Sequence, residues 1–539
     1  MSVGSPPSEA TENTCPVDVL VIGGGVAGLC AALEAAAAGA CVHLLEAAPR
    51  PLRGGNARHS RNLRQANVHE TPWQRDHYPV ADFRAELLAA TGHSSSVGSC
   101  GDIEDSASTA LLVDTLVAGS SELADWLMAH GVALQPTAGG LIPWSRKTVF
   151  FLGGGKAMVN ALYAAADTAG IHVTYDCRVP SLPLEPARPT TSPAASGPMS
   201  EREESATCAP GAPDARFAII AETPRGPRRF SARAVVVASG GYPANRDWLA
   251  ERWGDAARHF ANRGSPYLRG ELLHALLAQG AQPVGVAGDC HLVAVDARAP
   301  QDDAGIVSRV DGMPLGIVVN RDGQRVCDEG EDIGPIRFSH WGQRLAHLPG
   351  QLAWLLLDAD GLAALPALLC PPVMAPTLEA LAARTEIDGD ALIRTVATFN
   401  DALAAARANG DERATPPGQP SRRVHDKPPI RPLLRAPFAA IPMQPGVSFT
   451  CFGVAVDAAA RLRRDDGSVC SALFAAGMIM APAILGSAYL SGAALTISAV
   501  FGRIAGRNAA AVALPRPNAA ATLPAGATAP APLPGNSPP

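Results

Sequence analysis

The chain has 539 residues, of which 47% are hydrophobic, and a formal net charge of −6 at pH 7. This length exceeds what one hydrophobic core supports, so two or more domains are expected. The negative charge argues against nucleic acid as the main partner. The 11 cysteines form no C-x-x-C pair, which argues against a zinc site or an iron–sulfur cluster on this chain. Their number is odd and their positions are scattered, which favours reduced thiols in a cytoplasm.

Three segments have compositions that a packed core cannot use. Residues 1–13 are polar, contain no apolar segment typical of a signal peptide, and are expected to be disordered. Residues 181–213 are rich in Pro, Ser, Ala and Thr, and predict a disordered insertion. Residues 513–539 are rich in Ala and Pro, and predict a disordered tail. Residues 467–502 carry no charge, but Gly, Ser and Pro interrupt them, so a buried segment is favoured over a membrane span.

Residues 17–22 are an apolar segment of strand length, followed by G-x-G-x-x-G, an Ala-rich helical segment and a second apolar strand. Gly23 allows the tight turn, Gly25 lets the backbone approach a phosphate, and Gly28 lets the helix pack on the strand. The helix N-terminus offers unpaired N–H groups to an anion. Glu46 ends the second strand, where an acid accepts hydrogen bonds from ribose hydroxyls. The pattern predicts a dinucleotide site, and the alternative is an ordinary β-α-β turn.

The next segment, residues 47–67, is rich in Gly, Arg and Asn and predicts a loop with a functional role. Four of its arginines, at 53, 58, 61 and 64, indicate an anionic ligand, and the alternative is solvated surface charge. A second glycine-rich turn, FFLGGGK at 150–156, precedes a helical segment and a strand at 171–175. Strands are expected again at 217–220 and 234–238, the second ending on Ser-Gly-Gly.

The middle of the chain has a different pattern. Residues 247–253 and 269–278 predict helices, and 378–408 predict further helical structure. Between 289 and 320, short apolar runs alternate with Asp, Gly and Arg, which indicates a separate α+β lobe.

The segments VDVLVIGGGVAGL, AVVVASGG and LFAAG resemble those of the fumarate reductase/succinate dehydrogenase flavoprotein family over residues 16–512, apart from the insertion. More narrowly, RGGNARHSRNLR, FFLGGGKA, CHLVAVDARAP, PLGIVVNRDG and DEGED are similar to tricarballylate dehydrogenase. A related flavin module occurs in a cobalamin-biosynthesis protein, which these motifs do not exclude.

The resemblance implies an α/β fold: a Rossmann-like FAD-binding domain of residues 14–246 and 436–512, with an inserted α+β capping domain of residues 247–435 that closes over the flavin. Covalent members of the family carry a His where this chain has Asn56, so non-covalent FAD is expected. The residues expected to contact FAD are Gly23, Gly25, Gly28, Glu46, Gly54, Gly55, Asn56, Gly154, Gly155, Ser239, Gly240, Gly477, Met478 and Leu495.

The chain departs from the family at three positions. Met478 replaces a Glu that contacts the flavin region, and Met cannot accept a hydrogen bond comparably. Phe449 stands where fumarate reductases have a carboxylate-binding His, and Tyr489 stands where they have an Arg. A Tyr in this loop resembles 3-ketosteroid dehydrogenases, where it assists catalysis.

Dehydrogenation between adjacent carbons needs a hydride acceptor, a base and cations that hold the neighbouring carboxylate. The resemblance implies Arg337 as the proton carrier, because VNRDGQR matches the segment upstream of the family's catalytic Arg; the alternative is that Arg337 only clamps a carboxylate. His291 and Tyr489 are the other catalytic candidates. The substrate-binding candidates are Ser308, Arg309, Arg61 and Arg64.

We therefore expect an FAD-dependent dehydrogenase that oxidises tricarballylate to cis-aconitate and passes electrons to a membrane-bound iron–sulfur protein. It is expected in the cytoplasm, peripheral to the inner membrane where that partner holds it, without inserting into the membrane. The alternatives are a dehydrogenase or reductase for another carboxylate or a 3-ketosteroid, a flavin module in cobalamin biosynthesis, and a flavin-binding assembly subunit without turnover.

Overall fold

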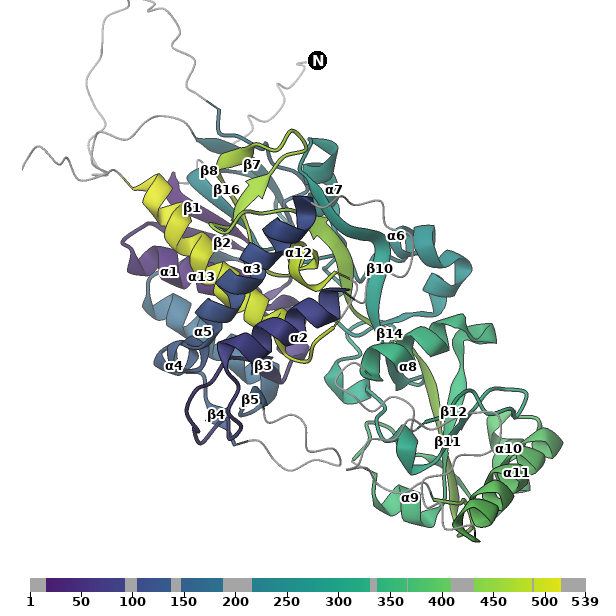
Figure 1. The fold of residues 1–539 in the computed structure, drawn as a ribbon. Coiled ribbons are helices and arrows are strands. Elements are labelled where there is room, and N and C mark those ends of the chain that lie inside the picture. Colours follow the sequence, from purple (N-terminus) through teal and green to yellow (C-terminus); the bar gives the residue numbers. More distant parts are fainter. Residues whose placement is uncertain are drawn as a thin grey trace, which may run out of the picture.

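The computed structural model describes residues 16–92, 104–136, 147–187, 216–329, 337–365, 367–408, 431–486 and 489–514. The segment expected to be disordered at 1–13 lies outside these residues, as do 188–213 of the insertion and 515–539 of the tail. Figure 1 shows two bodies of structure joined by the long strands β10 (Pro283–Asp296) and β14 (Phe438–Val454).

A seven-stranded sheet forms the first body, with strand order β15-β16-β8-β1-β2-β6 and β7 paired to β8. Strands β16, β8, β1, β2 and β6 run parallel to one another. Val19, Leu20 and Val21 of β1 are fully buried, as expected of a central parallel strand with covered faces. The bounds are β1 (Val17–Ile22), β2 (Val42–Leu45), β6 (His172–Thr174), β7 (Phe217–Thr223), β8 (Gly226–Val237), β15 (Arg461–Arg463) and β16 (Val469–Ala475).

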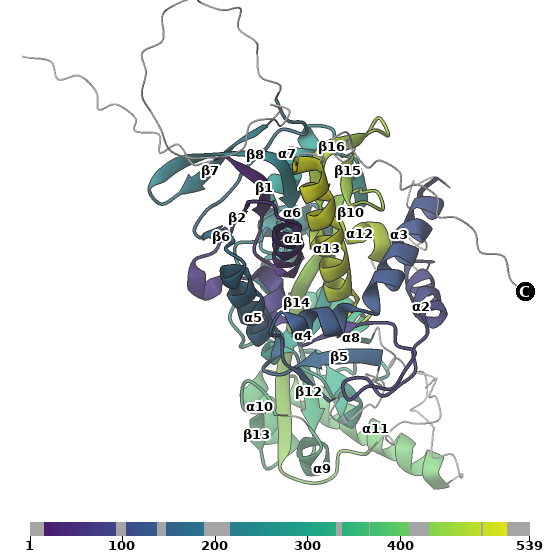
Figure 2. The same cartoon turned by 90° about the vertical axis from the view of Figure 1, so that its left-hand side faces the viewer.

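Helices α1 (Val26–Ala37) and α13 (Ala493–Ala513) lie side by side against this sheet (Figures 1 and 2). Glycines on α13 make the close approach possible: an added Cβ would lie 2.4 Å from Ala27 O at Gly502 and 2.2 Å from Ala31 O at Gly506. The uncharged segment 467–502 thus contains β16, the short helix α12 and the first part of α13, packed in the core. Within the described residues, no helix has both the length and the apolar character that a membrane span requires.

Further helices and a small sheet complete this body. A three-stranded sheet has the order β3-β5-β4. Its strands are β3 (Asn62–Arg64), β4 (Leu134–Gln135) and β5 (Thr148–Phe151). The helices are α2 (Val80–Gly92), α3 (Glu104–Ser120), α4 (Leu123–Ala129), α5 (Gly154–Thr168), α6 (Arg246–Trp253), α7 (Glu271–Ala278) and α12 (Pro482–Leu485).

A six-stranded sheet forms the second body, with order β10-β14-β12-β11 and with β9 and β13 paired to β14. Two apolar clusters pack on it, one against α10 and α11 and one against α8. The remaining bounds are β9 (Ala261–Asn262), β11 (Ile317–Val319), β12 (Ala353–Leu357), β13 (Val373–Ala375), α8 (Arg337–His347), α9 (Ala359–Ala363), α10 (Leu378–Thr385) and α11 (Gly389–Ala408).

The predicted fold class is confirmed: an α/β FAD-binding fold with a second α+β body. Strand β14 pairs with β10 and β12 of the second sheet, although residues 436–512 were assigned to the first domain from the sequence. The chain re-enters the seven-stranded sheet at β15 and β16. The exact division into domains stays a proposal.

Candidate active site

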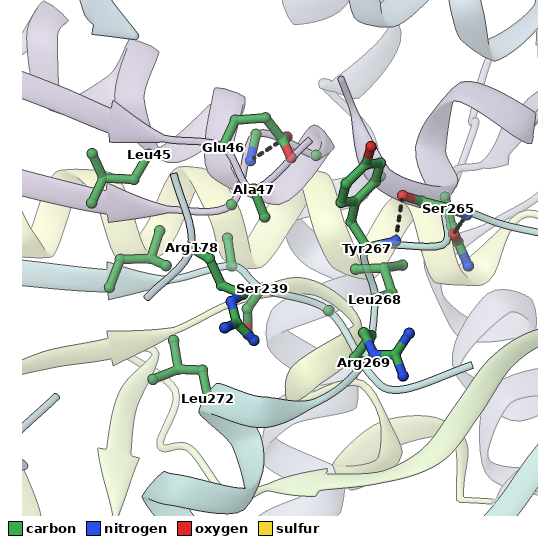
Figure 3. Close-up of a pocket in the computed structure, with 18 of the residues that line it drawn as sticks. Leu45, Glu46, Ala47, Arg178, Ser239, Ser265, Tyr267, Leu268, Arg269 and Leu272 are labelled. Atoms are coloured by element: carbon green, nitrogen blue, oxygen red, sulfur yellow. Dashed lines mark hydrogen bonds between the residues drawn. The ribbon is translucent and has the colours of Figure 1, made fainter. Parts of the chain in front are cut away.

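A cavity of about 600 Å³ opens where β1, β2 and β8 end. Residues 23–27, 45–47 and 238–241 contribute to its wall from the first sheet, and residues 265–272 close it from the other side (Figure 3). The carboxyl ends of parallel strands are where open α/β sheets bind ligands, because successive helices leave a crevice there.

The glycines of the first turn have steric reasons to be glycine. Gly23 has a φ of +105°, and a Cβ on it would lie 2.4 Å from Ala238 O. A Cβ on Gly28 would lie 1.8 Å from Gly23 O, so α1 packs on the turn only without a side chain there. Gly25 caps α1 without any side-chain hydrogen bond, which leaves the first-turn N–H groups directed at the cavity.

Glu46 connects the glycine turn at Gly24 to the glycine turn at Gly54 through hydrogen bonds. Its carboxylate accepts hydrogen bonds from the N–H groups of Gly24 (3.0 Å), Ala48 (2.9 Å) and Gly54 (3.4 Å), and Tyr163 Oη lies 3.4 Å away. Burial raises the pKa of Glu46, and the backbone donors oppose that rise. The side chain also lines the cavity, so it can support the turn and face a ligand hydroxyl.

The short helix η2 (Gly55–His59) connects the two bodies through Asn56. The Asn56 Nδ2 donates to Ser448 O at 2.7 Å, and its Oδ1 accepts from Ser265 N at 2.8 Å. Behind this loop, Gly155 N donates to Ser60 O at 2.7 Å, and a Cβ on Gly155 would meet Ala57 O at 2.2 Å. The second glycine-rich turn therefore supports the loop from behind.

A second cavity, of about 170 Å³, is contiguous with the first. The two share the lining residues Asn56, Ala57, Phe449, Met478 and Ser498. The second cavity is lined by Arg61, Arg263 and Arg309, and no Asp or Glu is among its described lining residues. The three arginines therefore give the wall of the smaller cavity a positive character.

The three arginines differ in their partners. Arg309 lines the cavity and also forms a salt bridge, because its Nη2 lies 3.5 Å from Asp311 Oδ2. Arg263 donates to Ser448 Oγ and to Gly305 O, and burial lowers the pKa of Arg263 to about 10. The Arg61 guanidinium carbon lies 5.7 Å from the Phe150 ring centroid.

His291 stacks on Tyr489, with ring centroids 4.2 Å apart, and on Phe449, at 4.9 Å. Burial, and then the charges of Arg263 and Arg309, lower the pKa of His291 to about 3, so the ring is neutral at physiological pH. Its Nδ1 has no hydrogen-bond partner among the described residues. The Tyr489 hydroxyl accepts from Gly492 N at 3.4 Å.

Residues 18–495 match the family described as FAD binding domain. The chain belongs to this FAD-binding family. It is 24% identical over 527 residues to a probable fumarate reductase, Ifc3, of Shewanella frigidimarina (strain NCIMB 400), across 95% of this chain and 77% of the relative.

Solved structures share the fold. An open conformation of a flavocytochrome c3 fumarate reductase matches with a TM-score of 0.67 and 22% identity, over 94% of this chain and 80% of that one. A 3-ketosteroid delta1-dehydrogenase from Sterolibacterium denitrificans matches with a TM-score of 0.66 and 18% identity, over 92% of this chain and 100% of that one. The predictions of an FAD cofactor and of an FAD-dependent oxidoreductase are confirmed.

The residues present fit FAD. The first cavity offers a glycine turn, uncapped helix N–H groups and an acid at the strand end, as a dinucleotide requires. The predicted FAD contacts that line it are Gly23, Gly25, Glu46, Gly55, Asn56, Ser239, Gly240, Gly477 and Met478. Leu495 lines the second cavity instead. Gly28, Gly54, Gly154 and Gly155 line neither, and pack behind the wall.

Some of the predicted substrate-binding and catalytic residues line the second cavity, and others do not. Arg61, Arg309, His291 and Tyr489 meet at the second cavity. Arg64 does not line it, because its buried guanidinium donates to Ser491 O, Tyr78 Oη and Glu86. Ser308 donates to Gly305 O at 2.8 Å and does not line it either. Arg337 begins α8, and its side chain lies outside the described part of the chain.

The lining residues that were not singled out from the sequence include Arg263 and Tyr267. Arg263 lines the second cavity, and Tyr267 lines the first, opposite Glu46 and Ala47 (Figure 3). The available signal was NRGSPY at 262–267, where an arginine stands among small residues between two expected elements. Such a segment resembles an ordinary turn until β9 pairs with β14 and brings it to the cavity.

Proposed function

We propose that this flavoenzyme oxidises tricarballylate to cis-aconitate. Bound FAD would supply the two-electron acceptor, taking a hydride at N5 while the adjacent carbon loses a proton. The observation that carries the proposal is the second cavity: three arginines and no described acidic side chain line a space contiguous with the FAD cavity.

Size and charge together favour a compact polyanion. A cavity of about 170 Å³ lies below the roughly 300–1,000 Å³ typical of sites for drug-sized ligands, so it suits a six-carbon acid better than a four-ring steroid. Each arginine offers a planar fork that matches a carboxylate. Three such groups correspond in number to the three carboxylates of tricarballylate.

The chain's own residues would hold the substrate and receive its proton. The arginine charges stabilise negative charge that develops on the carboxylate beside the reacting carbon. Neutral His291 can donate one hydrogen bond without adding charge. We assign the proton to Arg337 from the family resemblance, and retain a carboxylate clamp as its alternative role. The guanidinium of arginine stays protonated at neutral pH, so accepting a proton requires a relay or a desolvated site.

Electrons would leave to a membrane-bound iron–sulfur protein, and we propose that the enzyme is cytoplasmic and peripheral to the membrane. The proposal rests on the resemblance to tricarballylate dehydrogenase. Binding to detergent-washed membranes, with and without an added quinone, would test it: electron transfer to the membrane fraction supports the partner, and transfer to soluble acceptors alone contradicts it.

The experiment for the main proposal is anaerobic bleaching of the flavin absorbance by a panel of tricarballylate, succinate and a 3-ketosteroid. Tricarballylate should bleach the flavin fastest, and cis-aconitate should appear in equal amount to reduced flavin. Bleaching by the steroid alone would overturn the proposal.

A second candidate is a dehydrogenase for another carboxylate or a 3-ketosteroid. Tyr489 favours it, because this residue lines the second cavity where fumarate reductases are expected to have an arginine. The arginines oppose the steroid branch, since an apolar ligand would desolvate these cations without supplying a negative charge. Bleaching by succinate alone would select the carboxylate branch.

A further inference from the structure

Arg263 is held rigidly at the wall of the second cavity. It follows β9, whose pairing with β14 continues into the hydrogen bond from Arg263 N to Val447 O at 3.0 Å. The side chain is 9% exposed. Its Nη1 donates to Ser448 Oγ, and its Nε donates to Gly305 O at 3.5 Å. Ser448 and Gly305 therefore fix the plane of the guanidinium.

The positive charge of Arg263 has no acidic partner among the described residues. The other buried arginines of the described residues do: Arg64 pairs with Glu86 and Arg503 with Glu34. An uncompensated buried charge is costly, and proteins keep one where a ligand completes the pair. Among the described residues, the titratable groups that act on Arg263 are Arg61, Tyr489, neutral His291 and His59. His59 bonds to the Asp303 carboxylate at 2.6 Å, and Arg58 lies 3.5 Å from the same carboxylate, so that acid is paired with His59 and Arg58 and not with Arg263.

An acidic partner for Arg263 can come from a ligand in the second cavity. Arg263 lines the second cavity and not the first, so it faces the space beyond the residues that the two cavities share. Arg309 is partly neutralised by Asp311 at 3.5 Å, whereas Arg263 has neutral acceptors only. A carboxylate arriving in the cavity would gain more from Arg263 than from Arg309.

We propose that Arg263 is the principal carboxylate-binding residue of this site and that the ligand it awaits is a substrate carboxylate. The inference rests on the proposed function and deepens it. Two parallel N–H groups of the guanidinium would bind the two carboxylate oxygens, with Ser448 orienting the fork. Arg61 and Arg309 then bind the remaining carboxylates at the same cavity.

The test uses holoenzyme with oxidised FAD, so that ligands bind without turnover. The probes are cis-aconitate, the proposed product, and fumarate, a dicarboxylate. The variants are Arg263→Met, which removes the charge, Arg263→Lys, which removes the fork, and Arg258→Met. Arg258 is a matched control from the same segment, because it is 76% exposed and its ion pair is with an exposed Asp255.

Titration of the flavin absorbance gives dissociation constants. Arg263→Met should weaken cis-aconitate binding by about 10- to 150-fold, as expected when charge-assisted hydrogen bonds are lost. Arg263→Lys should fall between that variant and wild type, and Arg258→Met should match wild type. Without ligand, the melting temperature of Arg263→Met should equal or exceed that of wild type, because an unpaired buried charge has been removed.

The outcomes separate the two proposals. If wild type binds fumarate but not cis-aconitate, the tricarballylate proposal fails, and Arg263 is then judged on fumarate binding. Equal affinities for wild type and Arg263→Met would overturn the inference. A lowered melting temperature in the unliganded Arg263→Met and Arg263→Lys variants, with ligand affinity retained, would show that the residue is structural. Failure of wild type to bind either acid would overturn both.

Discussion

Changing Gly28 to Ala should weaken FAD binding by displacing the N-terminus of α1. The added Cβ would lie 1.8 Å from Gly23 O, and Cβ contacts shorter than 3.0 Å are essentially never observed. Helix and turn must therefore separate by about 1.2 Å, the difference between these two distances. That movement draws the first-turn N–H groups away from the phosphates they are placed to bind.

The size of the expected loss in FAD affinity follows from the steric overlap. Overpacking of this kind costs roughly 1–3 kcal/mol, and an equal loss in cofactor binding is roughly 5- to 150-fold in dissociation constant. Fluorescence quenching during titration of the apoprotein with FAD measures this constant. Circular dichroism of the apoprotein shows whether the variant is folded.

Gly39→Ala is the matched control, because Gly39 follows the other end of α1. It has a φ of +89° and no atom within 4 Å of an added Cβ. This change should cost roughly 1–2 kcal/mol of stability from backbone strain and leave the FAD affinity unchanged. Wild-type FAD affinity in Gly28→Ala, or an equal loss of affinity in both variants, would refute the reasoning.

Four further predictions concern Asn56, Arg337, Arg309 and Glu46. FAD should remain in the supernatant after acid precipitation, because the amide of Asn56 provides no nucleophile for a flavin bond; colour in the pellet would contradict this. Arg337→Ala should nearly abolish substrate-driven flavin reduction while FAD content survives, and near-normal single-turnover reduction would remove Arg337 from the mechanism. Arg309→Met should weaken cis-aconitate binding far more than fumarate binding, as titrations of oxidised flavin would show; equal losses would leave the third carboxylate to other cations. Burial raises the pKa of Glu46 in the folded apoprotein above its ordinary value of 4.5. The stability that protonated Glu46 contributes is therefore fully present below about pH 4.5, and it is lost as the pH rises through the pKa of the folded state. The melting temperature of wild type relative to Glu46→Gln should accordingly fall as pH increases, and a constant difference would show that Glu46 titrates normally.

The nucleotide-binding unit could be predicted from the sequence because its determinants are local. The G-x-G-x-x-G turn lies between β1 and α1, and Glu46 ends the next strand, so one β-α-β unit brings them together. The uncharged segment 467–502 was correctly interpreted as core, because Gly and Pro mark its division into β16, a turn and α13.

The choice among the loop arginines depended on tertiary structure. Arg61 and Arg64 are three residues apart in extended chain, and side chains at that spacing point to opposite faces. One therefore lines the cavity, while the other is buried against Tyr78 and Glu86. Composition shows that both are cations and gives no information about which face a distant helix covers.

The sequence by itself determined the family, the FAD cofactor and the α/β fold, because these depend on short segments with fixed spacing. Only the tertiary structure decided the composition of the cationic cavity. Arg61 precedes β3, Arg263 follows β9, and Arg309 follows η6 (Ile306–Ser308), so the three are separated by at least 46 residues (309 minus 263). They meet because β14 pairs with both β9 and β10, and because Asn56 donates a hydrogen bond to Ser448 on β14. These contacts join segments that are far apart along the chain, so no local sequence pattern predicts them.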